Sequence, residues 1–360
     1  MSAAGHPEDA HARAAAALSD AEFVRLVGTA DGDAVAAAGL LARGLDALET
    51  PYQISLAAVP EPPATGSDCG VAVGHPTGDV TLETEPLAVE AADIVSGFAP
   101  DAVDPELALA GAACAGVEPS GRLLETAGLE RRPGVAVPTD DPIAGLAGTT
   151  LVHASFSGEE GAVEDALDDL DSLGDPGGRE LASLVALSAI EGAPPRAAEA
   201  VERALRPYVT DRFGTLGGFG DVLDSLARVR PGTAIALALG HDVEAAALES
   251  WRAHGGRAHA ALRGADTGRY DGVYIVRLEE GSPALLGTVA RLCLSYRSPE
   301  PVALAVTDGA AAAAGETAVG KPLREATAAL DGRATARGTH GTATFDGTIA
   351  GFTATFREAV

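Results

Sequence analysis

The sequence predicts an α/β protein with a mostly parallel sheet, a helical insertion and a smaller C-terminal α/β domain. In its first third, short apolar runs alternate with helix-like segments, the order expected of a parallel sheet covered by helices on both faces. A second alternation of the same kind begins at residue 273. The chain has 360 residues, 46% of them hydrophobic, which is enough for two domains with buried cores.

Four strands and three helices are expected in the N-terminal part. The strands are the apolar runs 23–27, 52–59, 69–74 and 79–83. The helices are the segments 33–49, 86–98 and 104–116, which are rich in Ala and Leu. A turn-rich connection follows over 131–161.

The middle of the chain predicts an insertion made of helices. These cover 162–173, 179–190 and 196–205, and the stretch 217–241 leads to a long helix over 243–265. In the C-terminal part we expect a strand over 273–280, a helix over 283–295 and a strand over 301–309, followed by an alanine run, 310–318, interpreted as a mobile loop. This gives an N-terminal tail (1–20), a first domain (21–241) with an insertion at about 159–206, a connecting helix (242–268) and a C-terminal domain (269–360).

The charge balance is strongly acidic. There are 25 Lys and Arg residues against 52 Asp and Glu residues, a net charge of 25 − 52 = −27, and Lys321 is the only lysine. This pattern is typical of adaptation to a high-salt cytoplasm such as that of haloarchaea; the alternative is an acidic surface for one partner. Such a chain repels nucleic acid at low salt, but at molar salt the Debye length is about 3 Å and the repulsion is short-ranged.

No membrane span or signal peptide is expected. No apolar run reaches the roughly 18 residues of a membrane helix, and the first 20 residues lack a basic start followed by an apolar core. We therefore expect a cytoplasmic protein. Cys69, Cys114 and Cys293 form no CxxC pair, so they predict neither a zinc site nor a disulfide framework, and we interpret them as small buried residues.

Five segments in order resemble one family. They are GTADGDAVAAAG (28–39), DPELALAGAACAG (104–116), DDPIAGLAGTT (140–150), DVLDSLARVRPGTAIALALG (221–240) and RGTHGTATFDG (337–347). They resemble the DHH phosphoesterases, and among these the archaeal RecJ-like proteins that accompany GINS. The resemblance implies a DHH-type sheet domain for 21–241 and a DHH-associated substrate-binding domain for 269–360.

The resemblance also implies a metal-dependent chemistry from which this sequence departs. The family hydrolyses phosphodiesters with two metal ions, usually manganese, held by aspartates and histidines. Here Thr29 stands where the leading aspartate belongs, and Gly74 where the next one belongs. Glu83-Thr84-Glu85 replaces Asp-His-His, and a later aspartate position falls on Ala115 or Gly116. Most of the ligand set is missing, so no cofactor is expected unless the protein is an enzyme that uses manganese or magnesium.

The acidic turn Asp31-Gly32-Asp33 has two interpretations. We favour a helix cap in which Asp33 accepts a backbone N–H of the first turn. The alternative is a residual single-metal site at Asp31 and His75, or completed by Asp68.

Two further patterns are interpreted as structural. The segment GETAVGKP (315–322) has phosphate-loop spacing, but Pro322 replaces the hydroxyl residue that binds magnesium, so it indicates the start of a helix. In WRAHGGRAH (251–259), His254 and His259 are five residues apart, which does not place both on one helix face. We interpret that segment as a solvated basic face.

Four residues are candidates for contact with nucleic acid. By the resemblance, Arg228 matches the arginine of the family's Asn-Ala-Cys-Gly-Arg region, and Arg337, Gly338 and His340 match its Gly-Gly-His motif. The alternatives are a buried or helix-end arginine for Arg228 and a turn histidine for His340.

The sequence therefore predicts a RecJ-like protein of replication or repair without nuclease activity. By resemblance it is a helicase-associated subunit that binds GINS and contacts single-stranded DNA weakly, with the helix 284–296 as the partner surface. Two alternatives remain open: an active 5′→3′ single-strand exonuclease or other phosphodiesterase, and a scaffold that binds only proteins.

Overall fold

The chain folds into two units, each built around a β-sheet. The computed structural model describes residues 7–63, 69–171, 178–278 and 281–360. The first unit contains residues 1–129 and 222–247, and the second contains 130–221 and 248–360. The helical segment after residue 130 thus belongs with the C-terminal domain, because its side chains share a core with that domain.

The first unit has a four-stranded parallel sheet in the order β2-β1-β3-β4. The strands are β1 (Val24–Thr29), β2 (Tyr52–Ala57), β3 (Cys69–Val73) and β4 (Val80–Leu82). The helices in residues 7–129 are α1 (Pro7–Asp20), α2 (Gly32–Ala47), α3 (Leu87–Ser96), α4 (Pro105–Cys114) and α5 (Gly121–Ala127), with a 3-10 turn, η1 (Pro100–Ala102). The segment expected to be a tail is therefore helical from Pro7.

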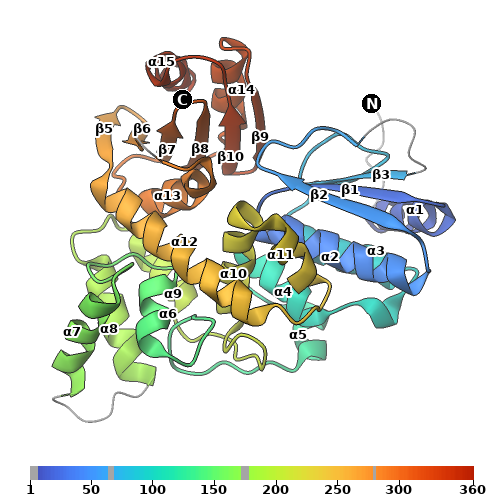
Figure 1. Ribbon diagram of the computed structural model, residues 1–360, viewed down its shortest axis with the longest axis horizontal. Helices are drawn as coiled ribbons and strands as arrows, with labels where there is room; N and C mark the ends of the chain where they lie inside the picture. Colours follow the sequence, from blue (N-terminus) through green and yellow to red (C-terminus); the bar gives the residue numbers. More distant parts are fainter. Residues whose placement is uncertain (1–6, 64–68, 172–177, 279–280) are drawn as a thin grey trace. The chain divides into compact units, whose positions relative to one another are not determined.

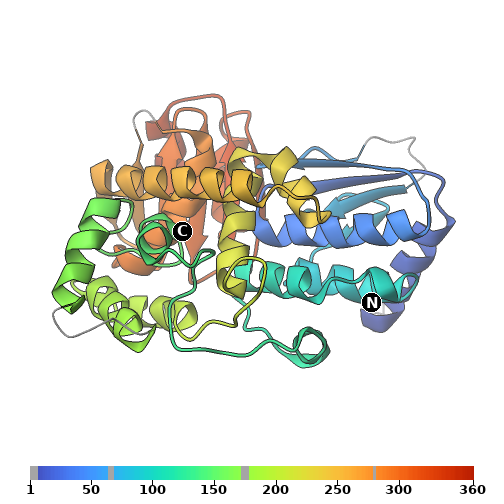
Figure 2. The ribbon, with the colours of Figure 1, turned by 60° about the horizontal axis from the view of Figure 1, so that its bottom comes forward.

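The helices cover this sheet less completely than the alternation predicted. Helices α2 and α3 lie on the same side of the sheet (Figure 2). On β2, Gln53, Ser55 and Ala57 are exposed, while the residues between them are half-buried. The expectation of a sheet covered on both faces is wrong for β2, because this strand lies at the edge and presents alternate side chains to solvent.

The second unit carries a group of helices before its sheet. They are α6 (Pro142–Gly148), α7 (Glu160–Asp171), α8 (Gly178–Ile190) and α9 (Ala197–Ala204). The chain passes between the units three times, once after Leu129 and once within each of two helices, α10 (Leu216–Val229) and α12 (Glu244–Gly264). Helix α11 (Pro231–Ala238) belongs to the first unit.

The C-terminal sheet has six strands in the order β5-β6-β7-β8-β10-β9. The strands are β5 (Asp266–Tyr270), β6 (Val273–Arg277), β7 (Val302–Thr307), β8 (Ala310–Gly315), β9 (Arg333–Arg337) and β10 (His340–Thr344). The pair β6 and β7 is parallel, and the other neighbours are antiparallel. Figure 1 shows this sheet with α13 (Pro283–Tyr296), α14 (Gly320–Ala328) and α15 (Ile349–Ala359).

Two cores form on opposite faces of the C-terminal sheet. Leu286, Val289 and Leu292 of α13 pack with Val276 of β6 and with the helices α6 to α9. On the other face, α14 and α15 contribute Leu323, Phe352 and Phe356 to a second cluster. Alternate residues of β6, β7 and β8 point into each cluster, as the two-residue period of a strand requires.

Three expectations from the sequence are wrong here. The alanine run is not a loop, because residues 310–315 form β8, buried and hydrogen-bonded to β7 and β10. The stretch 251–259 is a solvated basic face only at Arg252 and Arg257, since Trp251, His254 and His259 are fully buried. Helix α13 is not a free partner surface, because Leu292 is 0% exposed and its apolar face lies in the core. Among the described residues, none of the helices is long and apolar enough to cross a membrane.

Candidate functional site

The candidate site lies in the first unit, where parallel strands end at one edge of the sheet. Asp31 follows β1, His75 follows β3 and Glu83 follows β4. Residues after the carboxyl ends of parallel strands gather along the same edge, which is where ligands bind in open α/β sheets. The acidic turn after β1 is therefore placed as a family metal motif would be.

Asp31 acts as the N-cap of α2. Its extended backbone lets Oδ1 accept a hydrogen bond from the backbone N–H of Ala34 at 3.0 Å. The hydroxyl of Thr29 donates to Oδ2 of Asp31 at 2.6 Å. Both oxygens of Asp31 thus have donors within the turn itself.

Asp33 caps a different helix from the one that the sequence suggested. Its side chain is 1% exposed, and its oxygens accept the backbone N–H groups of Leu87 and Ala88 at 2.8 and 2.9 Å. These are the first residues of α3, whose own N-cap position, Pro86, offers no side-chain bond. The cap interpretation is correct for the turn, but Asp31 caps α2 and Asp33 caps α3.

Arg228 of α10 enters this site paired with Asp224 on the same helix. Nη2 of Arg228 lies 2.8 Å from Oδ1 of Asp224, and Nε lies 3.2 Å from Oδ2. Oδ1 of Asp224 also accepts the backbone N–H of Gly32 at 3.2 Å. Burial favours the neutral form of Arg228, yet its pKa is raised because the charges of Asp224 and Asp31 stabilise the guanidinium.

Gly32 is the residue that lets these elements come together. A Cβ at this position would lie 2.5 Å from Sγ of Cys114 and 2.9 Å from the backbone nitrogen of Asp224. No side chain fits at such distances, so the approach of α10 and α4 to the turn requires glycine.

His75 turns back onto the sheet. Its side chain is 6% exposed, and Nε2 donates to the carbonyl oxygen of Val27 at 3.0 Å. The pKa of His75 is lowered, chiefly because burial disfavours the charged imidazolium. Asp68, the other residue considered for a single-metal site, lies outside the described residues.

The donor set does not fit two divalent cations. Both oxygens of Asp31 accept hydrogen bonds, and those of Asp224 face the guanidinium of Arg228. Throughout the described ranges, no three His, Cys, Asp or Glu side chains gather as a metal site would need. A guanidinium is a fixed cation that neutralises carboxylates but cannot activate a water molecule as a metal ion does.

The four nucleic-acid candidates fall in different units. Arg228 belongs to the first unit, whereas Arg337, Gly338 and His340 belong to the second. Arg337 ends β9 and His340 begins β10, and the turn between them contains Gly338, which adopts a φ of 53°. His340 is exposed, and its Nδ1 lies 3.1 Å from the hydroxyl of Thr339.

The second unit contains a buried polar network that the sequence analysis missed. Asp221 is 2% exposed. It accepts hydrogen bonds from the hydroxyl of Thr149, from the hydroxyl and the backbone N–H of Thr150, and from the indole N–H of Trp251. The pKa of Asp221 is raised because of its burial. The Gly-Thr-Thr end of the segment 140–150 was the available signal, but sequence alone did not identify its partner.

A buried histidine pair lies beside that network. Nδ1 of His153 and Nδ1 of His259 are 2.9 Å apart, and Nε2 of His259 donates to the carbonyl oxygen of Thr149 at 2.9 Å. Because neutral His259 then has its only hydrogen on Nε2, its Nδ1 accepts and His153 must donate. Burial lowers the pKa of His153 to about 3 and that of His259 to about 4.

Two solved structures share the fold of the chain. CDC45 from Entamoeba histolytica matches with a TM-score of 0.55 and 8% identity over 98% of each chain. RecJ from Thermus thermophilus, solved with Mn²⁺, matches with a TM-score of 0.53 and 16% identity over 98% of this chain and 54% of RecJ. The chain thus spans about half the length of that RecJ. Its fold is that of RecJ and CDC45, which confirms the fold that the resemblance in the sequence implied.

Sequence comparison identifies a relative over the whole chain. Residues 265–358 match the family described as the C-terminal domain of uncharacterized protein rrnAC1427. The full chain is 46% identical, over 378 aligned positions covering 100% of both proteins, to uncharacterized protein rrnAC1427 from Haloarcula marismortui, whose source agrees with the haloarchaeal composition. The chain therefore belongs to the rrnAC1427 family and has the fold of RecJ and CDC45.

Proposed function

We propose that this protein is a non-nucleolytic RecJ-like subunit of cytoplasmic DNA replication or repair complexes. The observation that carries the proposal is the Arg228–Asp224 pair beside Asp31, where the fold would place a metal centre. An arginine there preserves the charge balance of the site and the packing around Gly32 without supplying a reactive water. The likeness to CDC45 and RecJ makes a replication role the natural one.

The first test is the absence of nuclease activity. In molar KCl with manganese or magnesium, the purified protein should release no nucleotides from end-labelled single strands, because the two-metal activation of water is missing. The matched control is the Asp31→Ala variant. Metal-dependent release that this variant abolishes would instead establish the exonuclease or phosphodiesterase alternative.

We further propose that single-stranded DNA contacts the C-terminal domain. Residues 265–358 contain 9 of the 25 Lys and Arg residues and 11 of the 52 Asp and Glu residues, a formal charge of 9 − 11 = −2. The rest of the chain has 16 − 41 = −25. Phosphate is repelled least by the C-terminal domain, where the turn at Gly338 presents Arg337 and His340.

The DNA contact can be tested with two arginines of one strand. Arg337→Ala should weaken binding of a labelled single strand, whereas Arg333→Ala, at the far end of β9, should have less effect. Equal losses from the two variants would indicate that only overall charge matters. Arg228 is engaged by Asp224, so Arg228→Gln should not weaken DNA binding directly.

A replication partner such as GINS is proposed to bind helix α8. Val185 and Ala189 of α8 lie in the core, but Leu187 is 69% exposed and Ile190 is 45% exposed on another face. Leu187 and Ile190 are three residues apart and therefore neighbours on the helix surface. An apolar contact of this kind strengthens in a salting-out environment, which the composition indicates.

Co-purification from the native host tests this partner. A tagged chain should recover GINS or other replication proteins at native salt, and Leu187→Arg should reduce the recovery. The control is Val117→Arg, which changes another exposed apolar residue, in the first unit. A folded, monodisperse protein that recovers no replication protein would support the scaffold alternative or the enzyme.

A further inference from the structure

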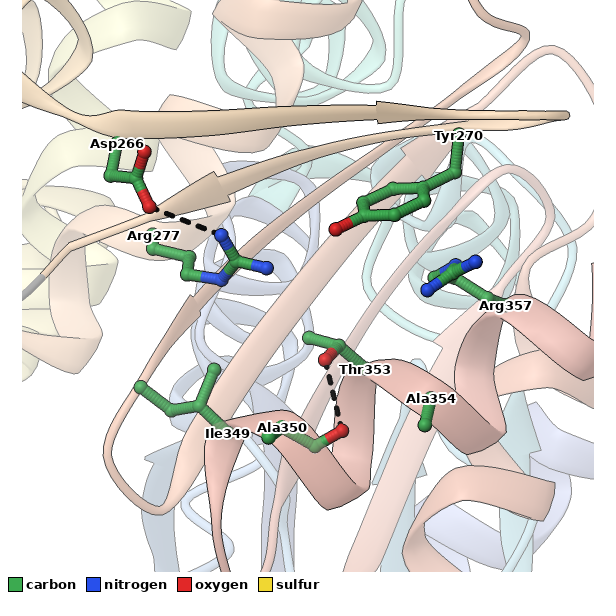
Figure 3. Close-up of a pocket in the computed structure, with 8 residues that line it drawn as sticks. All are labelled: Asp266, Tyr270, Arg277, Ile349, Ala350, Thr353, Ala354 and Arg357. Carbon is green, nitrogen blue, oxygen red and sulfur yellow. Dashed lines mark hydrogen bonds and ion pairs between the residues drawn. The ribbon is translucent and has the colours of Figure 1, made fainter.

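A cavity of about 480 Å³ lies at one edge of the C-terminal sheet. Figure 3 shows its lining, which comes from β5, β6 and α15 and includes Asp266, Tyr270, Arg277 and Arg357. Its volume falls in the range of pockets that bind small molecules. The strand order places this edge, β5, opposite the edge β9, so the cavity is separate from the turn at Gly338.

Strand register brings the polar groups of the cavity together. Asp266 and Arg277 are directly opposite in the antiparallel pair of β5 and β6, and Nη1 of Arg277 lies 3.1 Å from Oδ2 of Asp266. Gly268 and Tyr270 follow Asp266 on the same face of β5. A Cβ on Gly268 would lie 2.9 Å from Cε2 of Tyr270, so the ring lies against this glycine.

The second arginine comes from the last turn of α15. The guanidinium of Arg357 lies 3.7 Å from the centroid of the Tyr270 ring, a cation–π contact that orients it. Ala350 and Ala354, on the same helix, are small and leave the space beside the two arginines open. The guanidinium of Arg357 thus occupies one face of the ring, and a nucleotide base cannot stack on that face.

The charges of the cavity indicate an anionic ligand. Asp266 binds one nitrogen of Arg277, and the pKa of Arg277 is raised because Tyr270 and Asp266 lie beside its guanidinium. Within the described residues, Arg357 has no carboxylate in ion-pair contact. Two guanidinium groups against one carboxylate leave a positive charge, in a domain far less acidic than the rest of the chain.

We propose that this cavity binds a phosphate monoester, carried either by a small metabolite or by the end of a nucleic-acid strand. A phosphate monoester has close to two negative charges and three acceptor oxygens, so it can be bound by arginines of two elements at once. A single carboxylate would be satisfied by one bidentate arginine. Because Arg357 occupies a face of the Tyr270 ring, the site recognises the phosphate rather than a base stacked on that face. This inference does not depend on the role proposed above.

The test is the binding of defined phosphate ligands to the full chain in molar KCl. The probes are inorganic phosphate, adenosine monophosphate and oligothymidine with either a 5′-phosphate or a 5′-hydroxyl, measured by ³¹P NMR or calorimetry. Arg357→Gln should weaken binding of the phosphate-bearing probes about tenfold, the loss of one charge-assisted contact. Arg277→Gln should do the same, and Arg357→Lys should retain part of the affinity.

The control is Arg269→Gln on the same strand. Arg269 pairs with Glu300 at 2.6 Å and does not line the cavity, so this variant removes one charge from β5 without changing the site. If Arg357→Gln loses affinity only for adenosine monophosphate, the ligand is a small metabolite. If it loses affinity only for the 5′-phosphorylated strand, the ligand is a strand end. Either result supports the proposal. Absence of binding, or equal binding by folded Arg357→Gln and Arg269→Gln, overturns it.

Discussion

Arg228 and Asp224 show how a buried ion pair holds the acidic turn at Asp31 and Gly32 in place. Both side chains are at least four-fifths buried, 16% and 14% exposed, so each would be an uncompensated charge without the other. The charge of Asp31 adds to the field that holds the guanidinium ionised.

This arrangement predicts strong coupling between the two residues. Arg228→Gln should lower the free energy of unfolding by about 3 kcal/mol, because it leaves the carboxylate of Asp224 buried and unpaired. Adding Asp224→Asn should restore much of the loss in a double-mutant cycle measured by denaturant unfolding in molar KCl. Lys321→Gln, which breaks the exposed pair with Glu325, should change stability little. Additive losses in the cycle would contradict the coupling.

At the scale of elements, α6 and α12 approach each other through glycine. A Cβ on Gly255 of α12 would lie 1.9 Å from the carbonyl oxygen of Gly148 at the end of α6. The ring of Trp251 covers Gly148 on the same side, and its indole N–H reaches Asp221. The contact therefore fixes the position of the buried polar network.

Two adjacent glycines allow this packing to be tested. Gly255→Ala should destabilise the protein by several kcal/mol, since neither backbone can move without disturbing Asp221. Gly256→Ala should be neutral or stabilising by up to about 1 kcal/mol, because its nearest neighbour would be 3.8 Å away and alanine favours the helix. Thermal unfolding of both variants would measure this, and equal effects would be inconsistent with a close approach at Gly255.

The periodicity of apolar residues predicts an element well where either the strand pattern or the helix pattern clearly dominates. The four strands and the helices α2, α3 and α4 of the first unit lie within a few residues of the expected ranges, because apolar runs and Ala-rich segments differ clearly there. The contacts between elements that form the candidate site could not be predicted from this periodicity. The pairing of Asp33 with the start of α3 joins residues 54 and 55 positions apart, and no local pattern encodes it. Asp224 and Arg228, spaced i and i+4 on a helix, were an available signal that was missed.

For the whole molecule, the buried histidines make stability depend on pH. In the folded state the pKa of His153 is about 3 and that of His259 is about 4, below the ordinary value of 6.5, because burial disfavours the charged ring. The unfolded chain therefore binds more protons than the folded chain below pH 6.5. Stability is unaffected by this pair above that pH and falls as the pH decreases toward the folded-state values.

The effect should appear in unfolding curves recorded between pH 7 and pH 5. At pH 5 each histidine should lower the free energy of unfolding by about 2 kcal/mol. Between pH 7 and pH 5, the free energy of unfolding of His153→Gln should therefore fall by about 2 kcal/mol less than that of the original protein. A His153→Gln variant with the original pH dependence would show that the pair does not titrate on unfolding.

The five alanines of β8 have a consequence for how the chain reaches its fold. Alanine has the highest helix propensity of the residues, so nothing local directs residues 310–314 into a strand. Their extended form depends on hydrogen bonds to β7, which precedes them, and to β10, which is about thirty residues later. A nascent chain that ends before residue 340 lacks the second partner. The segment is then free to form transient helix, and the central part of this sheet should be completed only after β10 has emerged, which makes it a late step of folding.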